Sequence, residues 1–349
     1  MGLFDHVMGM FVPDLGIDLG TANTLVAVKE RGVVLAEPSV VAVKRGTKQL
    51  LDPNAVGNQA KIMIGKNPGS IEVIRPMKDG VIADLELTEA MLRYFIAKAG
   101  GRRGSFRPRV VVAVPSGINE VEKGAVTNSA MNAGARQVFL IKEPMAAAIG
   151  AGLPVGDAVG SMIVDIGGGT TEVAVISLAG IVASESVRCA GDELDNAIIK
   201  HVKSRHGIVI GENTAEQVKI HIGCAEVPDV EMRMTIRGRD LRTGMPAGIE
   251  VTATEIAQAI HTQVASIVNS VKMVLERTAP ELASDLIDRG IVMAGGTSQL
   301  RGLAALIARE TGLPVRLADE PLTCVARGCA AVLDNLEALQ PILETGTQR

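Results

Sequence analysis

The sequence predicts an α/β protein of two duplicated lobes with a cleft between them. Its 349 residues are 47% hydrophobic and 21% charged, which is enough to bury the cores of two domains of ordinary size. Short β-branched runs alternate with longer helical patterns. One motif, an aspartate followed by glycine and hydroxyl residues between two apolar runs, begins at Asp18 and again at Asp165. Its repetition indicates two lobes of the same plan.

The first half of the chain opens with three short strand patterns and continues as alternating helices and strands. The segment 52–80 carries Asn, Pro and Gly at intervals and is expected to be irregular. The pattern over 87–100 predicts a helix with Thr88 as N-cap and Gly100 as terminator. The other expected elements are strands over 15–18, 24–29, 39–44, 110–114 and 138–141 and a helix over 119–134.

The second half repeats this plan. Strand patterns over 161–165, 171–177 and 181–187 surround the second aspartate motif, as they do in the first half. A strand at 291–295 precedes a helix that begins near Ser298. The intervening segment predicts helices over 193–207, 214–223 and 254–277 and a strand pair around 231–240.

Three consecutive glycines, Gly167, Gly168 and Gly169, interrupt the strand run after Asp165. Glycine lacks Cβ and adopts positive φ angles, so such a turn can direct its amide groups to one concave side and attract an anion. An ordinary hairpin would explain one turn of this kind. Because the motif at Asp18 repeats it, an anion gripped from both halves explains the pair better.

The composition excludes several classes of function. The net charge is −4 and aromatic residues make up 2%, so no basic surface or stacking platform for nucleic acid is evident, and no nucleic-acid partner is expected. The four cysteines show no CxxC spacing and the histidines no HExxH pattern, which argues against disulfides and zinc and favours a reduced cytoplasm. No run reaches the roughly 20 apolar residues of a transmembrane helix, and no signal-peptide pattern is present. Walker and Rossmann motifs are also missing from the sequence.

Five motifs in a fixed order are specific to one superfamily. They are DLGTANT (18–24), EPMAAAIGAG (143–152), DIGGGTTEV (165–173), AGGTSQLRG (294–302) and ARGCAAVL (326–333), with PSG (115–117) and GDELD (191–195) between them. On these motifs the chain resembles the actin, Hsp70 and sugar-kinase superfamily, and within it the MreB family of bacterial actins. The resemblance covers nearly the whole chain, from about residue 14 to 333.

The resemblance implies an actin-like ATPase fold of two ribonuclease H-like lobes with a nucleotide cleft between them. Lobe I is expected over 14–156 plus 324–349, with a small subdomain at about 35–80. Lobe II is expected over 157–323, with a small subdomain at about 192–255. The runs 145–152 and 326–333 are rich in Ala and Gly. By resemblance they form crossing helices that act as a hinge, although small residues can also simply fill a core.

The implied ligands are ATP and Mg²⁺. By resemblance, Asp18 and Asp165 bind the metal through water, although each could alternatively cap its hairpin. Thr297 stands where the family usually has a third glycine, and Glu216 and Lys219 could also form a solvated ion pair. The nucleotide-binding residues that the resemblance implies are Gly20, Thr21, Ala22, Asn23, Thr24, Gly167, Gly168, Gly169, Thr170, Gly191, Glu216, Lys219, Gly295, Gly296 and Thr297.

The implied catalytic residues are Glu143, Thr170 and Asp165. In the family the glutamate that matches Glu143 positions the water that attacks the γ-phosphate, and Thr170 matches a residue that assists it. Pro144 suits the first turn of a helix, so Glu143 is expected near the N-cap, where it could alternatively serve only as a cap. Positioning and charge neutralisation suffice for a slow ATPase.

Residues 1–13 predict an amphipathic segment that binds membranes, as in many members of the family. A disordered start, or packing on the protein's own surface, is the alternative. A second apolar contact is expected at Phe106, although its loop could be merely solvated. The apolar face of the segment comprises Leu3, Phe4, Val7, Met8 and Phe11.

Three functions share the expected nucleotide site. The resemblance implies a polymerising ATPase that organises lateral cell-wall synthesis and maintains rod shape, with a sugar-type kinase as the alternative and an Hsp70-type chaperone as a third. The short run after the helix at 326–333 argues against a peptide-binding domain. The implied partners are the protein itself, the inner face of the cytoplasmic membrane, and the cell-wall elongation machinery with a RodZ-type membrane adaptor.

Overall fold

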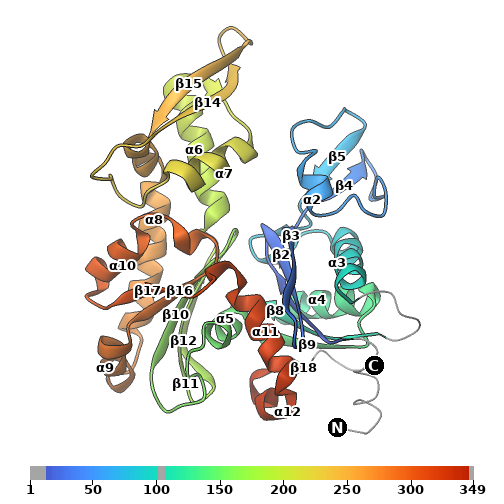
Figure 1. The fold of residues 1–349 in the computed structure, drawn as a ribbon, viewed down its shortest axis with the longest axis vertical. Coiled ribbons are helices and arrows are strands. Elements are labelled where there is room, and N and C mark those ends of the chain that lie inside the picture. Colours follow the sequence, from blue (N-terminus) through green and yellow to red (C-terminus); the bar gives the residue numbers. More distant parts are fainter. Residues whose placement is uncertain (1–12, 101–106, 346–349) are drawn as a thin grey trace.

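Two large sheets of matching strand order organise the fold (Figure 1). The structure, a computed structural model, describes residues 13–100 and 107–345. The first sheet has the order β18-β9-β8-β1-β2-β3 and the second β12-β11-β10-β16-β17. The first comprises β1 (Leu15–Leu19), β2 (Asn23–Val28), β3 (Gly32–Pro38), β8 (Arg109–Val114), β9 (Gln137–Lys142) and β18 (Glu344–Thr345). The second comprises β10 (Ser161–Ile166), β11 (Thr171–Ser177), β12 (Gly180–Val187), β16 (Ile291–Ala294) and β17 (Val315–Leu317).

The two aspartate motifs occupy equivalent places in these sheets. Asp18 on β1 is paired with Leu25 in antiparallel register and with Ala113 in parallel register. Asp165 on β10 has the same two kinds of neighbour, on β11 and β16. Both aspartates therefore stand near the carboxyl end of a central strand, just before a tight turn. The expected duplication is confirmed.

Two helices pack against each other between the sheets, α5 (Glu143–Gly150) and α11 (Cys324–Asp334). A Cβ on Gly150 would lie 1.8 Å from the carbonyl oxygen of Cys324, and one on Gly328 would lie 1.9 Å from that of Ala146. No side chain fits at either point. The two helix backbones are therefore in direct contact, and the alanines of α5, with Val325 and Cys329 of α11, belong to a core shared by both sheets.

Other helices cover the remaining faces. α3 (Leu85–Gly100) and α4 (Glu120–Ala133) pack on the first sheet through buried apolar residues. A capping box between Asn119 and Glu122 begins α4. The 24-residue α8 (Ala253–Glu276) contributes its apolar face to the core of the second sheet. The same side carries α9 (Pro280–Arg289) and α10 (Leu303–Thr311).

A small subdomain extends from each sheet toward the top of Figure 1. The one on the first sheet contains α2 (Asn58–Lys61), β4 (Val41–Lys44) and β5 (Ile71–Ile74), followed by the hairpin of β6 (Met77–Lys78) and β7 (Val81–Ile82). The one on the second contains α6 (Gly191–His206), β13 (Ile208–Val209), α7 (Glu212–Ile222), β14 (Arg233–Asp240) and β15 (Pro246–Thr252). α12 (Leu336–Leu339) follows α11. The exact lobe and subdomain boundaries stay predictions.

Several local predictions are wrong. The expected strand over 39–44 does not join the main sheet but pairs with β5, and the third strand of the sheet is β3, which was not expected. The segment 52–80 is not irregular throughout. Helix α3 begins at Leu85, where the Asp84 carboxylate accepts the Leu87 N–H, so Thr88 is not its N-cap. The helix expected near Ser298 begins at Leu303, after a 3-10 turn.

Over residues 13–100 and 107–345, no helix has both the length and the apolar character needed to cross a bilayer.

Candidate functional site

A cavity of about 570 Å³ lies between the two lobes. Sixteen of the predicted nucleotide and metal residues, together with Glu143, line it, and they come from both halves of the chain. They are Asp18, Gly20, Thr21, Ala22, Asn23, Glu143, Asp165, Gly167, Gly168, Gly169, Thr170, Gly191, Glu216, Lys219, Gly295, Gly296 and Thr297. The separate motifs of the sequence therefore converge on one site.

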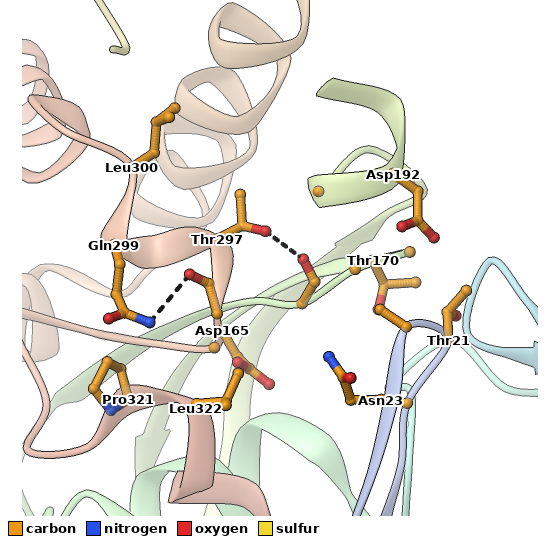
Figure 2. A pocket seen from close by; sticks show the side chains of 18 of the residues that line it. Thr21, Asn23, Asp165, Thr170, Asp192, Thr297, Gln299, Leu300, Pro321 and Leu322 are labelled. Atoms are coloured by element: carbon orange, nitrogen blue, oxygen red, sulfur yellow. Dashed lines mark hydrogen bonds between the residues drawn. The ribbon is translucent and has the colours of Figure 1, made fainter. Parts of the chain in front are cut away.

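The two glycine turns face each other at close range. A Cβ on Gly168 would lie 2.4 Å from Cβ of Ala22, and one on Gly169 would lie 2.5 Å from Oγ1 of Thr21. Only glycine permits this approach. Figure 2 shows Thr21 and Asn23 close to Thr170 of the second turn. An anion between the turns would meet backbone and hydroxyl groups from both lobes.

The structure does not support the prediction that Thr24 binds the nucleotide. Its side chain is fully buried and does not line the cavity. Its hydroxyl is hydrogen-bonded to Ser39 at 2.9 Å, and the Ser39 hydroxyl in turn donates to the carbonyl of Gly20 at 2.6 Å. Thr24 is the second residue of the return strand β2, and its side chain holds the first turn in place through Ser39 instead of lining the cavity.

Three carboxylates line the cavity, of which Asp165 and Glu143 are buried and Asp18 is half-buried. Burial raises the pKa of Asp18 to about 7. Burial, then the charges of Asp18 and Glu172, raise the pKa of Asp165 to about 8. Burial, then the charges of Glu172, Asp18 and Asp165, raise the pKa of Glu143 well above its usual range. A site that disfavours so many negative charges attracts a cation.

Asp18 and Asp165 fit a magnesium ion. Mg²⁺ usually keeps several waters and binds through one or two carboxylates and the substrate's phosphates. Two carboxylates on the central strands of facing lobes, beside a pair of anion-binding turns, supply that donor set. Within the described residues no group of three or more His, Cys, Asp and Glu side chains is arranged to hold a metal ion.

Glu143 is the first residue of α5, with Pro144 after it, as the sequence predicts. The helix begins at the cavity, and Glu143, which is 7% exposed, lines the site. Thr170 lines the same cavity from the second turn. A carboxylate and a hydroxyl thus face the region beside the two turns, where a water could be oriented.

The opposite side of the cavity is held by polar contacts of α7 and the 294–302 segment. Glu216 pairs with Lys61 at 2.9 Å, whereas Lys219 pairs with Asp195 at 2.8 Å. The two residues therefore do not form the simple pair that their spacing allows. The hydroxyl of Thr297 donates to the carbonyl of Gly167 at 2.7 Å, which joins two turns of the site (Figure 2).

Several lining residues were missed in the sequence. Gly80 was missed because its segment was expected to be irregular, yet a Lys-Asp-Gly run signals a tight turn, and Asp79 and Gly80 have φ of 51° and 78°. Apolar side chains at one end of the cavity carried no signal, because such residues usually belong to the core. These are Ile220, Leu300 and Leu322, and the polar residues Asp192, Asp195 and Gln299 were missed as well. In Figure 2 Gln299 lies beside Leu300, whereas Asp192 lies on the side of Thr170 and Thr21.

The predicted membrane contacts Leu3, Phe4, Val7, Met8, Phe11 and Phe106 lie outside the described residues.

Comparisons with known proteins agree with this geometry. The model of the family described as MreB/Mbl protein matches residues 12–341. The cell shape-determining protein MreB of Escherichia coli K12 is 53% identical over 335 residues, which cover 94% of this chain and 95% of that protein. The cell shape-determining protein Mbl of Bacillus subtilis 168 is 46% identical over 330 residues, which cover 95% of this chain and 98% of that protein.

Solved structures of similar proteins confirm the expected actin-like fold. MreB5 of Spiroplasma citri bound to ADP is 36% identical and superposes with a TM-score of 0.86, covering 93% of this chain and 97% of that one. The same protein bound to AMPPNP superposes with a TM-score of 0.87, covering 94% of this chain and 98% of that one.

Proposed function

Because this chain belongs to the MreB/Mbl family, we propose that it binds ATP and polymerises into filaments that organise lateral cell-wall synthesis and maintain rod shape. The named relatives are cell shape-determining proteins, and MreB5 of Spiroplasma citri has been solved with ADP and with AMPPNP. The observation that carries the nucleotide part is the cavity between two matching glycine turns, which three carboxylates also line.

The nucleotide would lie along the cavity with its phosphates between the turns. Thr21, Asn23 and the glycines of the second turn supply hydroxyl, amide and backbone groups there. The adenine would lie toward Ile220, Leu300 and Leu322, whose apolar side chains suit the faces of a flat ring. The polar groups nearest that end, Glu216 and Lys219, suit the ribose.

Slow hydrolysis needs little more than positioning and charge neutralisation. Asp18 and Asp165 would hold Mg²⁺ through water, and the bound ion would neutralise charge on the phosphate oxygens. Glu143 would orient the attacking water and accept its proton, since burial and neighbouring charges make this carboxylate unusually basic. Thr170 would fix the position of that water from the second turn.

Attachment to the inner face of the cytoplasmic membrane would depend on assembly. Full burial of one large apolar side chain contributes roughly 1.5–3 kcal/mol, but an interfacial segment buries only part of each. No Lys or Arg precedes Lys29, so anionic lipid adds little. A single subunit should bind weakly, and a filament strongly, because linked segments raise each other's effective concentration. The cell-wall elongation machinery, with a RodZ-type adaptor, would then be recruited to the filament.

Sedimentation with and without ATP and lipid vesicles tests this function. Full-length protein should pellet with ATP, and it should carry vesicles with it only under those conditions. A variant that lacks residues 1–11 should still pellet with ATP but leave the vesicles behind. Protein that stays monomeric in every condition and transfers phosphate to a small sugar would overturn the proposal in favour of a kinase.

A further inference from the structure

Glu172 on β11 is a buried carboxylate that the proposed mechanism does not use. Glu172 is 1% exposed, and it does not line the cavity. Among the described residues no Lys, Arg or His forms an ion pair with it. Keeping a carboxylate out of water without a cation costs several kcal/mol, so stability alone does not explain it.

The Glu172 side chain links the two lobes. Its Oε2 accepts the backbone N–H of Ser116 at 3.2 Å, and its Oε1 accepts the hydroxyl of Ser186 at 2.5 Å. Ser116 lies in the loop after β8 of the first sheet, whereas Ser186 is on β12 of the second. Across the second sheet, Asp165, Glu172 and Ser186 stand in one row of the strand register.

The loop that Glu172 holds continues to the phosphate end of the cavity. A Cβ on Gly80 would lie 3.0 Å from Cγ of Pro115 and 2.9 Å from Cγ2 of Thr170. The Gly80 N–H donates to Oγ1 of Thr21 at 2.9 Å. The contacts therefore run without a gap from Glu172 through Pro115 and Gly80 to one threonine of each phosphate turn.

We propose that Glu172 is a positioning residue for hydrolysis: it fixes the 115–117 loop of lobe I against lobe II and so sets the places of Thr21 and Thr170. This inference rests on the proposed ATPase. Because Glu172 acts behind the cavity wall, its loss should slow hydrolysis and leave nucleotide affinity nearly unchanged. Its two hydrogen bonds, and not its charge, carry this role.

The test compares ATP affinity, from titration with a fluorescent ATP analogue, with the single-turnover rate of phosphate release. Glu172→Ala removes both acceptors and should slow release at least about tenfold, since a misplacement of about 1 Å can cost about a hundredfold in rate. Affinity should stay within about threefold, which a single hydrogen bond can account for. Glu172→Gln keeps an acceptor for Ser116 and can donate to Ser186, so it should restore release to within about threefold of wild type.

Glu185→Ala is the matched control. Glu185 precedes Ser186 on β12, and its ion pair with Arg277 does not involve the cavity, so release should not change. Ser186→Ala removes one donor to Glu172 and should slow release about threefold. If Glu172→Ala does not fold, the Ser186→Ala variant tests the positioning role of Glu172 in its place.

The outcomes separate this inference from the function on which it rests. Wild-type protein that binds no ATP would overturn the proposed function. Active wild type with an equally fast Glu172→Ala variant would overturn only the role of Glu172, as would an unchanged Ser186→Ala variant. A Glu172→Gln variant as slow as Glu172→Ala would also overturn it, because charge and not positioning would then be required.

Discussion

Replacing the carboxylate of Asp165 by an amide, Asp165→Asn, should stabilise the nucleotide-free protein at high pH and leave it unchanged at low pH. The folded protein holds the pKa of this group at about 8, against 3.8 when it is exposed. A carboxyl with a raised pKa binds its proton more tightly in the folded state. The free energy of unfolding of the wild type therefore falls as pH rises from about 4 to about 8, and the asparagine variant lacks this part of the loss.

The size of the effect follows from the shift. Each pKa unit corresponds to about 1.4 kcal/mol, so a rise of about four units sets a ceiling of roughly 6 kcal/mol. Water in the 570 Å³ cavity hydrates the ionised group and reduces this value. We expect Asp165→Asn to raise the free energy of unfolding by about 2–4 kcal/mol at pH 8.5 and by under about 0.5 kcal/mol at pH 5.

Urea unfolding of the monomer in EDTA, at both pH values, measures this difference. Asp229→Asn, at an exposed aspartate remote from the cavity, is the control and should change neither midpoint. Mg²⁺ and ATP should reduce or reverse the advantage of Asp165→Asn at pH 8.5, because the wild-type carboxylate then has a cation to bind. An equal gain at both pH values, or a loss at pH 8.5 without ligand, would refute the charge-repulsion account.

Three further predictions follow from the geometry. Glu143→Ala should retain ATP binding and lose most phosphate release; unchanged release would remove Glu143 from its role. Arg75 pairs with Glu212 across the cleft at 3.5 Å, so either Arg75→Glu or Glu212→Arg should speed the release of a fluorescent nucleotide up to about fivefold, and the double swap should restore the wild-type rate. Gly328→Val should lower the free energy of unfolding by about 3 kcal/mol or more, because the valine side chain would meet a carbonyl of α5. Gly124→Ala, in open space on α4, is the control and should raise the free energy of unfolding by about 0.5–1 kcal/mol. Equal thermal unfolding midpoints for the two variants would contradict the close crossing.

The sequence predicted the duplicated plan because its strongest signals are local. The strands next to Asp18 and Asp165 are buried on both faces and read as continuous apolar runs, and glycines mark the turns after them. The edge strand β3 was missed because it is mostly half-exposed and its pattern is mixed. The run over 39–44 has the composition of a strand, but sequence pattern alone does not specify which sheet a strand joins.

Contacts between distant segments explain the other differences. Gly80 reaches the site through its hydrogen bond to Thr21, 59 residues away in sequence, and no local pattern encodes that distance. Thr24 belongs to a motif whose members mostly line the cavity, yet the return strand turns its side chain to Ser39. Asp84 caps the first turn of α3, although Thr88 is also a residue type that favours caps.

We expect the two lobes to pivot about the crossing of α5 and α11 at Gly150 and Gly328. With no side chain between the backbones, the helices can turn against each other with little repacking, whereas sliding apart would expose their alanines. In Figure 1 the hairpin of β14 and β15 and the pair of β4 and β5 lie farthest from this crossing, at the ends of two long arms. If the proposed filament hydrolyses ATP, a small rotation at this crossing would be magnified at those two ends, and the loss of one phosphate would become a displacement that a neighbouring subunit could detect.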